Sequence, residues 1–146
     1  MTLYAAYGSN LDPRQMLQRA PHSPHLGTGW IRGWRVTFGG EEIGWEGSVA
    51  TLAEDRHASV FVSIYDLTKQ DESALDEWEG VTTDLYRKIR VRVETMTGAQ
   101  LCYVYVLNSF EGGKPSQRYL EIMIAAAIEA GAPDDYIAEL RERAIR

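Results

Sequence analysis

The order of the predicted strands and helices indicates an α+β fold, a small mixed sheet curled into a barrel-like core with flanking helices. Apolar alternation and turn residues predict the order β-α-β-β-β-α-β-β-α-α along the chain. This order does not alternate regularly enough for a doubly wound parallel sheet. The chain has 146 residues, of which 45% are hydrophobic and 25% charged, so we expect one globular domain spanning 1–146 with a substantial core.

The N-terminal part of the chain is predicted to run from a strand through a turn into a helix. The first apolar run, Leu3 to Tyr7, indicates a short strand. Asp12 is placed to cap a helix whose first residue is Pro13 and which ends near Arg19. An apolar-rich strand is then expected around Trp30 to Phe38.

The middle of the chain is predicted to hold a glycine-rich loop, two strands and a helix. A mobile acidic loop and a lid over a site both explain the composition of the loop 39–47. The two strands are expected at Val49 to Ala53 and at Ser59 to Leu67. Thr68, with an acidic residue three positions later, predicts the cap of a helix that ends before Gly80.

A β-hairpin and two helices complete the predicted order. The runs Ile89 to Glu94 and Gln100 to Leu107 flank a turn at 96–98, which predicts the hairpin. Both parities of the second run are apolar, so we expect that strand to be buried on both faces. The helices are expected from the cap Ser116 to Ala130, with Gly131 past the end, and from Pro133 to near Ala144.

The end of the first strand carries the most informative motif, Tyr7-Gly8-Ser9-Asn10 followed by Leu11. A glycine at the bend gives the backbone freedom and lets a ligand come close to the main chain. Successive N–H groups in such a turn form a concave site that holds a carboxylate or a phosphate. Most turns of this kind are only turns, so the motif by itself assigns no function.

Further motifs lie downstream, and together with the first they resemble one family. They are Gly47-Ser48-Val49-Ala50-Thr51, Leu75-Asp76-Glu77-Trp78-Glu79-Gly80-Val81 and Pro115-Ser116-Gln117-Arg118-Tyr119. In this order, and over almost the whole chain, they resemble the γ-glutamylcyclotransferase (AIG2-like) family. The resemblance is specific for the superfamily and much less so for the substrate.

The resemblance implies an enzyme that releases 5-oxoproline from a small γ-glutamyl compound without a metal or an organic cofactor. Its catalytic glutamate corresponds to Glu79, which precedes Gly80-Val81 at a helix end. The residues that the resemblance assigns to substrate binding are Tyr7, Gly8, Ser9, Asn10, Leu11, Tyr86, Tyr105 and Tyr119. It assigns no leaving amine and no oligomeric state.

Glu79 occupies a position where a carboxyl group is expected to have a raised pKa. At roughly 100° per residue, the apolar side of its helix is defined by Ala74, Leu75 and Trp78. Glu79 lies at the edge of that side, about 40° from Leu75, and Glu77 points nearly the opposite way. The negative end of the helix dipole and burial beside Trp78 both raise the pKa of Glu79 toward neutrality, where a carboxyl group accepts and returns a proton. A surface position in a solvated acidic helix is the alternative.

The tyrosines have two interpretations. Tyr86, Tyr105 and Tyr119 match tyrosines that line the family's substrate cavity, but core packing with a satisfied hydroxyl also explains them. Core packing is the preferred interpretation for Tyr103. Strict alternation places Tyr86 on the same face of its strand as Lys88, so either the strand starts after Tyr86 or a bulge redirects the side chain.

The charge and hydropathy patterns argue against several other classes of protein. The net charge is −6 and no stretch collects Lys and Arg without acids nearby, so neither nucleic acid nor an anionic membrane is expected as a partner. The basic residues at 87, 88, 90 and 92 alternate with apolar ones and indicate the wet face of a half-buried strand. No apolar run approaches the length that spans a bilayer, and the first is too short for a signal peptide, so we expect a cytoplasmic protein.

Candidate metal ligands and nucleophiles are weak. Cys102 is the only cysteine, which excludes an intrachain disulfide and a cysteine-based metal cluster. The histidines His22, His25 and His57 lack neighbours at metal-ligand spacing, so no zinc site is expected. Ser9 has no histidine or lysine placed by the sequence to activate it as a nucleophile.

We therefore expect an intramolecular aminolysis. The substrate's α-carboxylate docks on the N–H groups of Gly8, Ser9 and Asn10, and Glu79 moves a proton from the α-amino group to the leaving amine. One alternative is a cyclotransferase for γ-glutamylamines, whose cationic leaving group the acids at 41, 42 and 46 would suit. The other is a non-catalytic module that binds a small carboxylate, against which the presence of Glu79 counts.

Overall fold

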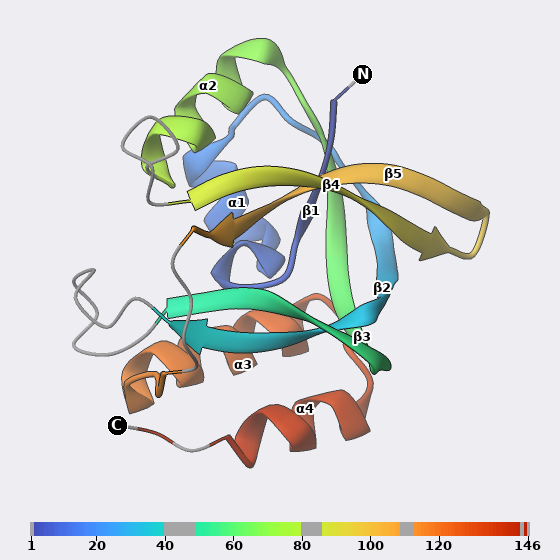
Figure 1. Ribbon diagram of the computed structural model, residues 1–146. Coiled ribbons are helices and arrows are strands. Elements are labelled where there is room, and N and C mark those ends of the chain that lie inside the picture. Colours follow the sequence, from blue (N-terminus) through green and yellow to red (C-terminus); the bar gives the residue numbers. More distant parts are fainter. Residues whose placement is uncertain (1, 40–48, 80–85, 109–112, 144, 146) are drawn as a thin grey trace.

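Figure 1 shows the computed structural model of the protein, which describes residues 2–39, 49–79, 86–108, 113–143 and 145. The predictions for Gly47-Ser48, for Gly80-Val81 and for nearly all of the loop 39–47 therefore lie outside the described residues. The strands are β1 (Thr2–Ala6), β2 (His25–Gly39), β3 (Val49–Leu67), β4 (Tyr86–Thr95) and β5 (Gly98–Leu107). The helices are the 3-10 turn η1 (Ser9–Leu11), α1 (Pro13–Arg19), α2 (Lys69–Trp78), α3 (Gln117–Glu129) and α4 (Asp134–Arg141).

The strands close into a barrel in the order β1-β3-β2-β4-β5. The pairs β1–β3, β2–β3 and β4–β5 are antiparallel. A parallel bridge between Tyr4 of β1 and Tyr103 of β5 closes the sheet. In Figure 1, α3 and α4 lie below β2 and β3, and α2 lies at the upper left above α1. The predicted α+β fold with a barrel-like sheet is confirmed.

The strand β3 corrects the prediction of two separate strands at 49–53 and 59–67. It is one strand of 19 residues, paired with β2 on both sides of a register shift. Arg32 pairs with Ser59 and Trp34 with Glu54, so the polar residues between these two partners form an irregularity opposite Gly33. Gly33 has a φ of 86°, in the left-handed region that favours glycine. A bulge inside a continuous hairpin therefore accounts for the polar interval that resembles a loop in the sequence.

The predicted starts of three helices are confirmed by side-chain caps. Asp12, Thr68 and Ser116 each accept a hydrogen bond from a backbone N–H in the first turn of α1, α2 and α3, at 2.9, 3.1 and 3.1 Å. Gly131 follows α3 with a φ of 84°, as expected of a glycine that ends a helix. The last helix, α4, is shorter than predicted and ends at Arg141.

The hairpin β4–β5 forms as predicted, but its second strand is buried on both faces only near one end. All residues from Val104 to Leu107 are buried, whereas Leu101 is 63% exposed and Tyr103 is half-buried. The turn end of the hairpin extends away from the helices (Figure 1), and its residues 96–99 are exposed. The ring of Tyr103 faces the cations of Lys88 and Arg90 at 5.3 and 5.4 Å, so the expected core packing of Tyr103 is wrong.

The core has two parts. The larger fills the barrel and includes Val60, Val62, Val93 and Val104, which are fully buried. The smaller lies between the sheet and the C-terminal helices and joins Leu11 and Phe61 to Ala126, Ala127, Ile137 and Leu140. Through this second cluster the C-terminal helices hold the turn η1 against the barrel.

Candidate active site

The turn η1 is closed by its own backbone. The N–H of Leu11 donates to the carbonyl of Gly8 at 3.0 Å, and the N–H of Asp12 donates to the carbonyl of Ser9 at 3.3 Å. A 3-10 turn leaves the N–H groups at its N-terminus without a partner inside the turn. The N–H groups of Ser9 and Asn10 therefore have no acceptor within η1.

Gly8 precedes this turn and leaves space in front of it. Its φ is −107°, outside the left-handed region that favours glycine. A Cβ atom added to Gly8 would lie 3.8 Å from the Cβ of Ala50, an ordinary contact, and both residues line the same cavity. The missing side chain thus keeps the cavity open beside the turn.

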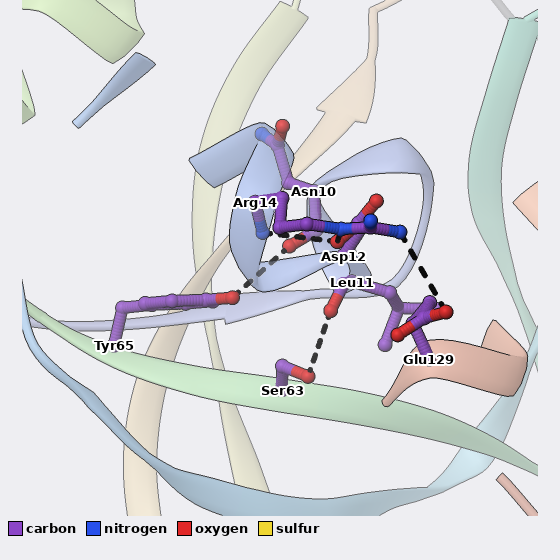
Figure 2. Close-up of polar contacts among 7 residues, drawn as sticks. All are labelled: Asn10, Leu11, Asp12, Arg14, Ser63, Tyr65 and Glu129. Atoms are coloured by element: carbon purple, nitrogen blue, oxygen red, sulfur yellow. Dashed lines mark hydrogen bonds and ion pairs between the residues drawn. The ribbon is translucent and has the colours of Figure 1, made fainter. Parts of the chain in front are cut away.

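Side chains of β3 hold the turn from below (Figure 2). The hydroxyls of Ser63 and Tyr65 donate to the carbonyls of Leu11 and Asn10 at 3.3 and 3.4 Å. The side chain of Leu11 is 1% exposed and packs in the smaller core cluster. Leu11 is not one of the described residues that line the cavity. The structure therefore places Leu11 as an anchor of the turn and does not bring it to the cavity.

A cavity of about 250 Å³ lies beside the turn. It is bounded by the end of β1, the start of β3, the C-terminus of α2, the start of β4 and the start of α3. The predicted site residues that line it are Tyr7, Gly8, Ser9, Asn10, Glu79, Tyr86, Tyr105 and Tyr119. Tyr4, Arg19, Val49, Ala50 and Trp78 also line it, and the sequence analysis did not select them as site residues.

Arg19 is the most consequential of the residues that the sequence analysis missed. Its Nη1 donates to Oδ1 of Asn10 at 2.6 Å and to Oγ of Ser9 at 3.3 Å. Burial lowers the pKa of Arg19 and the charge of Glu79 raises it, but an arginine remains charged at neutral pH. The cavity thus contains a positive charge whose position is fixed by hydrogen bonds.

In the sequence, Arg19 was recognisable only as a basic residue in the last turn of α1. A favourable interaction with the helix dipole explains such a residue equally well.

Glu79 is the C-cap of α2 and points into the cavity. Its N–H donates to the carbonyl of Leu75 at 2.8 Å, which fixes the backbone at the helix end. Burial raises the pKa of Glu79 from 4.5 to about 7, and the positive charge of Arg19 acts in the opposite direction. Glu77 is exposed, as predicted. The two carboxyl groups therefore differ in environment although they are close in sequence.

The apolar side of α2 is narrower than predicted. Leu75 is fully buried, but Ala74 is exposed and Trp78 is 64% exposed. The other buried position of the helix belongs to Asp71, whose carboxylate accepts hydrogen bonds from the loop before β2 at 2.7 and 2.8 Å. Trp78 lies at the rim of the cavity, over the guanidinium of Arg19. The helical periodicity of α2 placed Trp78 on the apolar side of the helix. Periodicity alone does not show whether an apolar ring on that side is buried in the core or lies at the rim of a cavity.

Backbone groups of β3 and β5 order three tyrosines of the cavity wall. The hydroxyl of Tyr86 donates to the carbonyl of Ala50 at 3.0 Å, and the hydroxyl of Tyr119 accepts from the N–H of Ala50 at 2.9 Å. The hydroxyl of Tyr7 donates to the carbonyl of Tyr105. Burial raises the pKa of Tyr7 and Tyr86 well above the usual value for tyrosine and raises that of Tyr119 to about 12. These hydroxyls therefore remain protonated at neutral pH.

The placement of Tyr86 follows neither of the two predicted alternatives. It is the first residue of β4, and the pairing of β4 with β5 runs from Tyr86 to Thr95 without a register shift. Lys88 shares its face, and the ammonium of Lys88 binds Glu72 at 2.7 Å and Asp76 at 3.1 Å. The start of that face is thus covered by α2, and Lys88 lies there because two carboxylates of α2 neutralise its charge. Alternation was correct, and the face is exposed at Arg90 and Arg92 as predicted, but it is not exposed at Tyr86.

Two further properties concern the whole described part of the chain. No group of three or more His, Cys, Asp or Glu side chains among the described residues is arranged to hold a metal ion. None of the helices in the described ranges combines the length and the apolar character that a membrane-spanning helix needs.

Comparisons with known proteins agree with this fold. The model of the AIG2-like family matches residues 59–140 of the chain. The γ-glutamylcyclotransferase of Homo sapiens is 30% identical over 144 residues, which cover 95% of this chain and 77% of that protein. The enzyme of the same name from Mus musculus is 29% identical with the same coverage.

Solved structures give the same result. A solved structure with the name γ-glutamyl cyclotransferase superposes on this chain with a TM-score of 0.92 and is 28% identical to it in sequence. The superposition covers 99% of this chain and 89% of that chain. The match to the human enzyme covers more than two thirds of that enzyme's length, and the match to the family model covers more than half of this chain. The chain therefore belongs to the γ-glutamylcyclotransferase-like (AIG2-like) superfamily.

Proposed function

We propose that the protein is a γ-glutamylcyclotransferase that releases 5-oxoproline from a γ-glutamyl compound by intramolecular aminolysis. The observation that carries this proposal is the pKa of Glu79, about 7, in a cavity that also contains the N-terminus of η1 and the Arg19 guanidinium. A carboxyl group with a pKa near neutrality accepts and returns protons at the pH of the cell. The names of the relatives support this chemistry.

The site offers a binding group for each charged part of a γ-glutamyl head. The α-carboxylate docks on the N–H groups of the Gly8-Ser9-Asn10 turn, beside the positive charge of Arg19. Arg19 is oriented by Ser9 and Asn10 and is covered by Trp78, so its charge is held near the turn. The α-amino group lies toward Glu79.

The reaction forms one bond and breaks one bond. Glu79 takes a proton from the bound α-ammonium group, and the freed amine nitrogen forms a bond to the γ-carbonyl carbon. This nitrogen loses a second proton as it becomes the ring amide. Glu79 passes the two protons in turn to the leaving nitrogen, whose bond to the carbonyl carbon breaks. Because nucleophile and carbonyl belong to one molecule, holding the chain folded supplies much of the rate. Acid–base transfer by Glu79 contributes about 10²–10⁴-fold.

The test is a substrate screen. The purified protein is incubated with γ-glutamyl dipeptides and γ-glutamylamines, and 5-oxoproline is measured by mass spectrometry. We expect release from at least one of these compounds, with the leaving amine in equal amount. The Glu79→Gln variant serves as the control for contaminating activity. If no compound of either class yields 5-oxoproline above this control, the proposed function is wrong.

A further inference from the structure

The carboxylate of Asp76 links an ion pair on α2 to the wall of the cavity. Its Oδ1 accepts a hydrogen bond from the hydroxyl of Tyr105 at 2.7 Å. Its Oδ2 accepts from the ammonium of Lys88 at 3.1 Å, and Lys88 also binds Glu72 at 2.7 Å. The side chains of Asp76 and Lys88 are 24% and 22% exposed, so the contact is largely shielded from water. Each oxygen of Asp76 thus has a defined partner.

This contact decides which way the hydroxyl of Tyr105 points its proton. A carboxylate accepts hydrogen bonds and donates none, so the proton of Tyr105 must lie toward Asp76. The phenol oxygen then has only lone pairs to present on its other side. Tyr105 is 3% exposed and lines the cavity, and burial, together with the hydrogen bond to Asp76, raises the pKa of this tyrosine. The free side of the oxygen therefore acts as an acceptor in the cavity that Glu79 also lines.

Two other hydroxyls of the wall have the same polarity. Tyr86 donates its proton to the carbonyl of Ala50, and Tyr7 donates to the carbonyl of Tyr105. The N–H groups of η1 and the guanidinium of Arg19 supply donors at the turn. The hydroxyls of Tyr4 and Tyr119 accept from Asn10 and from the N–H of Ala50, so they do not belong to this set of acceptors. A ligand with an ammonium group and a carboxylate group matches this division of donors and acceptors.

We propose that Asp76 is a positioning residue: by taking the hydroxyl proton of Tyr105, it makes that oxygen an acceptor that holds the substrate's α-ammonium group beside Glu79. The inference rests on the proposed function and adds to it the residue that orients the nucleophilic nitrogen. Lys88 has a part in it, since its ammonium occupies Oδ2 and leaves Oδ1 for Tyr105.

The first variant, Asp76→Asn, reverses this polarity at nearly constant size. The Lys88 ammonium requires an acceptor, so the amide oxygen turns to Lys88 and the amide NH₂ turns to Tyr105. The NH₂ group donates to the phenol oxygen, whose proton then points into the cavity. We expect KM for a γ-glutamyl dipeptide to rise about tenfold or more. The fall in kcat should be smaller, and the unfolding curve should remain cooperative.

The second variant, Asp76→Asn combined with Lys88→Met, tests the role of polarity. Without the lysine, the amide is free to turn its oxygen toward Tyr105 and to accept the hydroxyl proton again. We expect KM of the double variant to return to within about threefold of the Lys88→Met single variant. A merely structural role of Asp76 also allows such a recovery, because removal of both members of an ion pair often costs less than removal of one, so the binding measurement with and without the α-amino group decides between the two roles. A KM as high as that of Asp76→Asn would overturn the inference.

A binding measurement separates this inference from the proposed function. Calorimetry compares L-glutamine, the simplest γ-amide of glutamate, with glutaramate, which lacks the α-amino group. We expect the wild-type protein to bind glutamine more tightly than glutaramate. The Asp76→Asn variant should lose most or all of this preference. An unchanged preference in Asp76→Asn overturns the inference even if 5-oxoproline is released. Absence of 5-oxoproline with a preference that depends on Asp76 overturns the proposed reaction alone.

Discussion

The guanidinium of Arg19 lies over the indole of Trp78, with 4.5 Å between its central carbon and the ring centroid. Arg19 ends α1 and Trp78 ends α2, so the contact joins two helix C-termini at the rim of the cavity. It accounts for a tryptophan that is 64% exposed, since the ring covers a charge and not the core. It also fixes the cation whose field acts on Glu79.

Removing the charge of Arg19 should change both binding and the pH profile. In Arg19→Met, KM for a γ-glutamyl dipeptide should rise about 10–100-fold, because a charged partner of the α-carboxylate is lost. The positive charge of Arg19 lowers the pKa of Glu79, so its loss raises that pKa further. The acid limb of log kcat/KM against pH should therefore move to higher pH. Arg19→Lys keeps the charge and should leave the limb in place; a limb that is the same in all three proteins contradicts the prediction.

Glu79→Gln should abolish turnover while the thermal unfolding curve stays cooperative and, near pH 4.5, where the Glu79 carboxyl group is largely protonated in the folded protein, nearly unchanged. The amide has the same size as the carboxyl group but cannot shuttle a proton, so a loss of about 10²–10⁴-fold in kcat is expected. Glu77→Gln is the matched control, because Glu77 is exposed on the same helix and should be close to silent. Substantial activity in Glu79→Gln, measured by 5-oxoproline release, would show that another group transfers the proton.

The raised pKa of Glu79 predicts how stability depends on pH. Burial raises this pKa from 4.5 to about 7, so the folded protein binds the proton more tightly than the unfolded chain. The contribution to stability is fully present below about pH 4.5 and is lost as the pH rises through about 7. One pKa unit corresponds to about 1.4 kcal/mol, so the contribution amounts to up to about 3 kcal/mol.

Urea denaturation between about pH 4.5 and 8 measures this effect. The free energy of unfolding of the wild-type protein should fall over this range relative to that of Glu79→Gln, which has no group to ionise at this position. If the two proteins show the same pH dependence, the pKa of Glu79 is the same in the folded and the unfolded state, and its environment is not the one described.

Gly8→Ala should impair binding more than Ser9→Ala does. The backbone at Gly8 has a φ of −107° and the added methyl group lies 3.8 Å from Ala50, so the fold should tolerate it. The methyl group would nevertheless occupy space beside the donors of η1, and KM should rise about tenfold. Ser9→Ala removes only a 3.3 Å contact with Arg19 and keeps the N–H groups, so its effect should stay within about threefold. Equal effects of the two changes on KM would contradict a carboxylate site built from the backbone.

Acetylation of the substrate's α-amino group should stop the reaction, because that nitrogen is the proposed nucleophile. Hydrolysis by water would tolerate the acetyl group and would release N-acetylglutamate from the blocked compound and glutamate from the free one. Mass spectrometry of products from a free and an N-acetylated γ-glutamyl dipeptide distinguishes the two reactions. Free glutamate as the product of the unblocked dipeptide would exclude cyclisation.

Much of the local structure could be predicted from the sequence, because caps and turns depend on neighbouring residues. Asp12, Thr68 and Ser116 cap helices where they were expected to do so. Their short side chains reach N–H groups only two or three residues away, so no other part of the chain is required. The same holds for the position of Glu79 at a helix C-terminus, which the length and cap of α2 determine.

Only the tertiary structure decided which side chains share the cavity. Arg19 and Asp76 carried no distinguishing local signal. The importance of Arg19 comes from the packing of α1 beside η1, which places Asn10 against it, and that of Asp76 comes from the packing of α2 beside β5, which brings Tyr105 to it. Lys88 lies at the covered start of its strand face because α2 supplies carboxylates there, which alternation along β4 does not reveal. Periodicity shows that a face exists, whereas burial and charge pairing depend on what packs against it. The sequence by itself thus determined the family, the turn and the acid at the helix end, and contacts between distant segments determined the charge and the hydrogen-bond polarity around them.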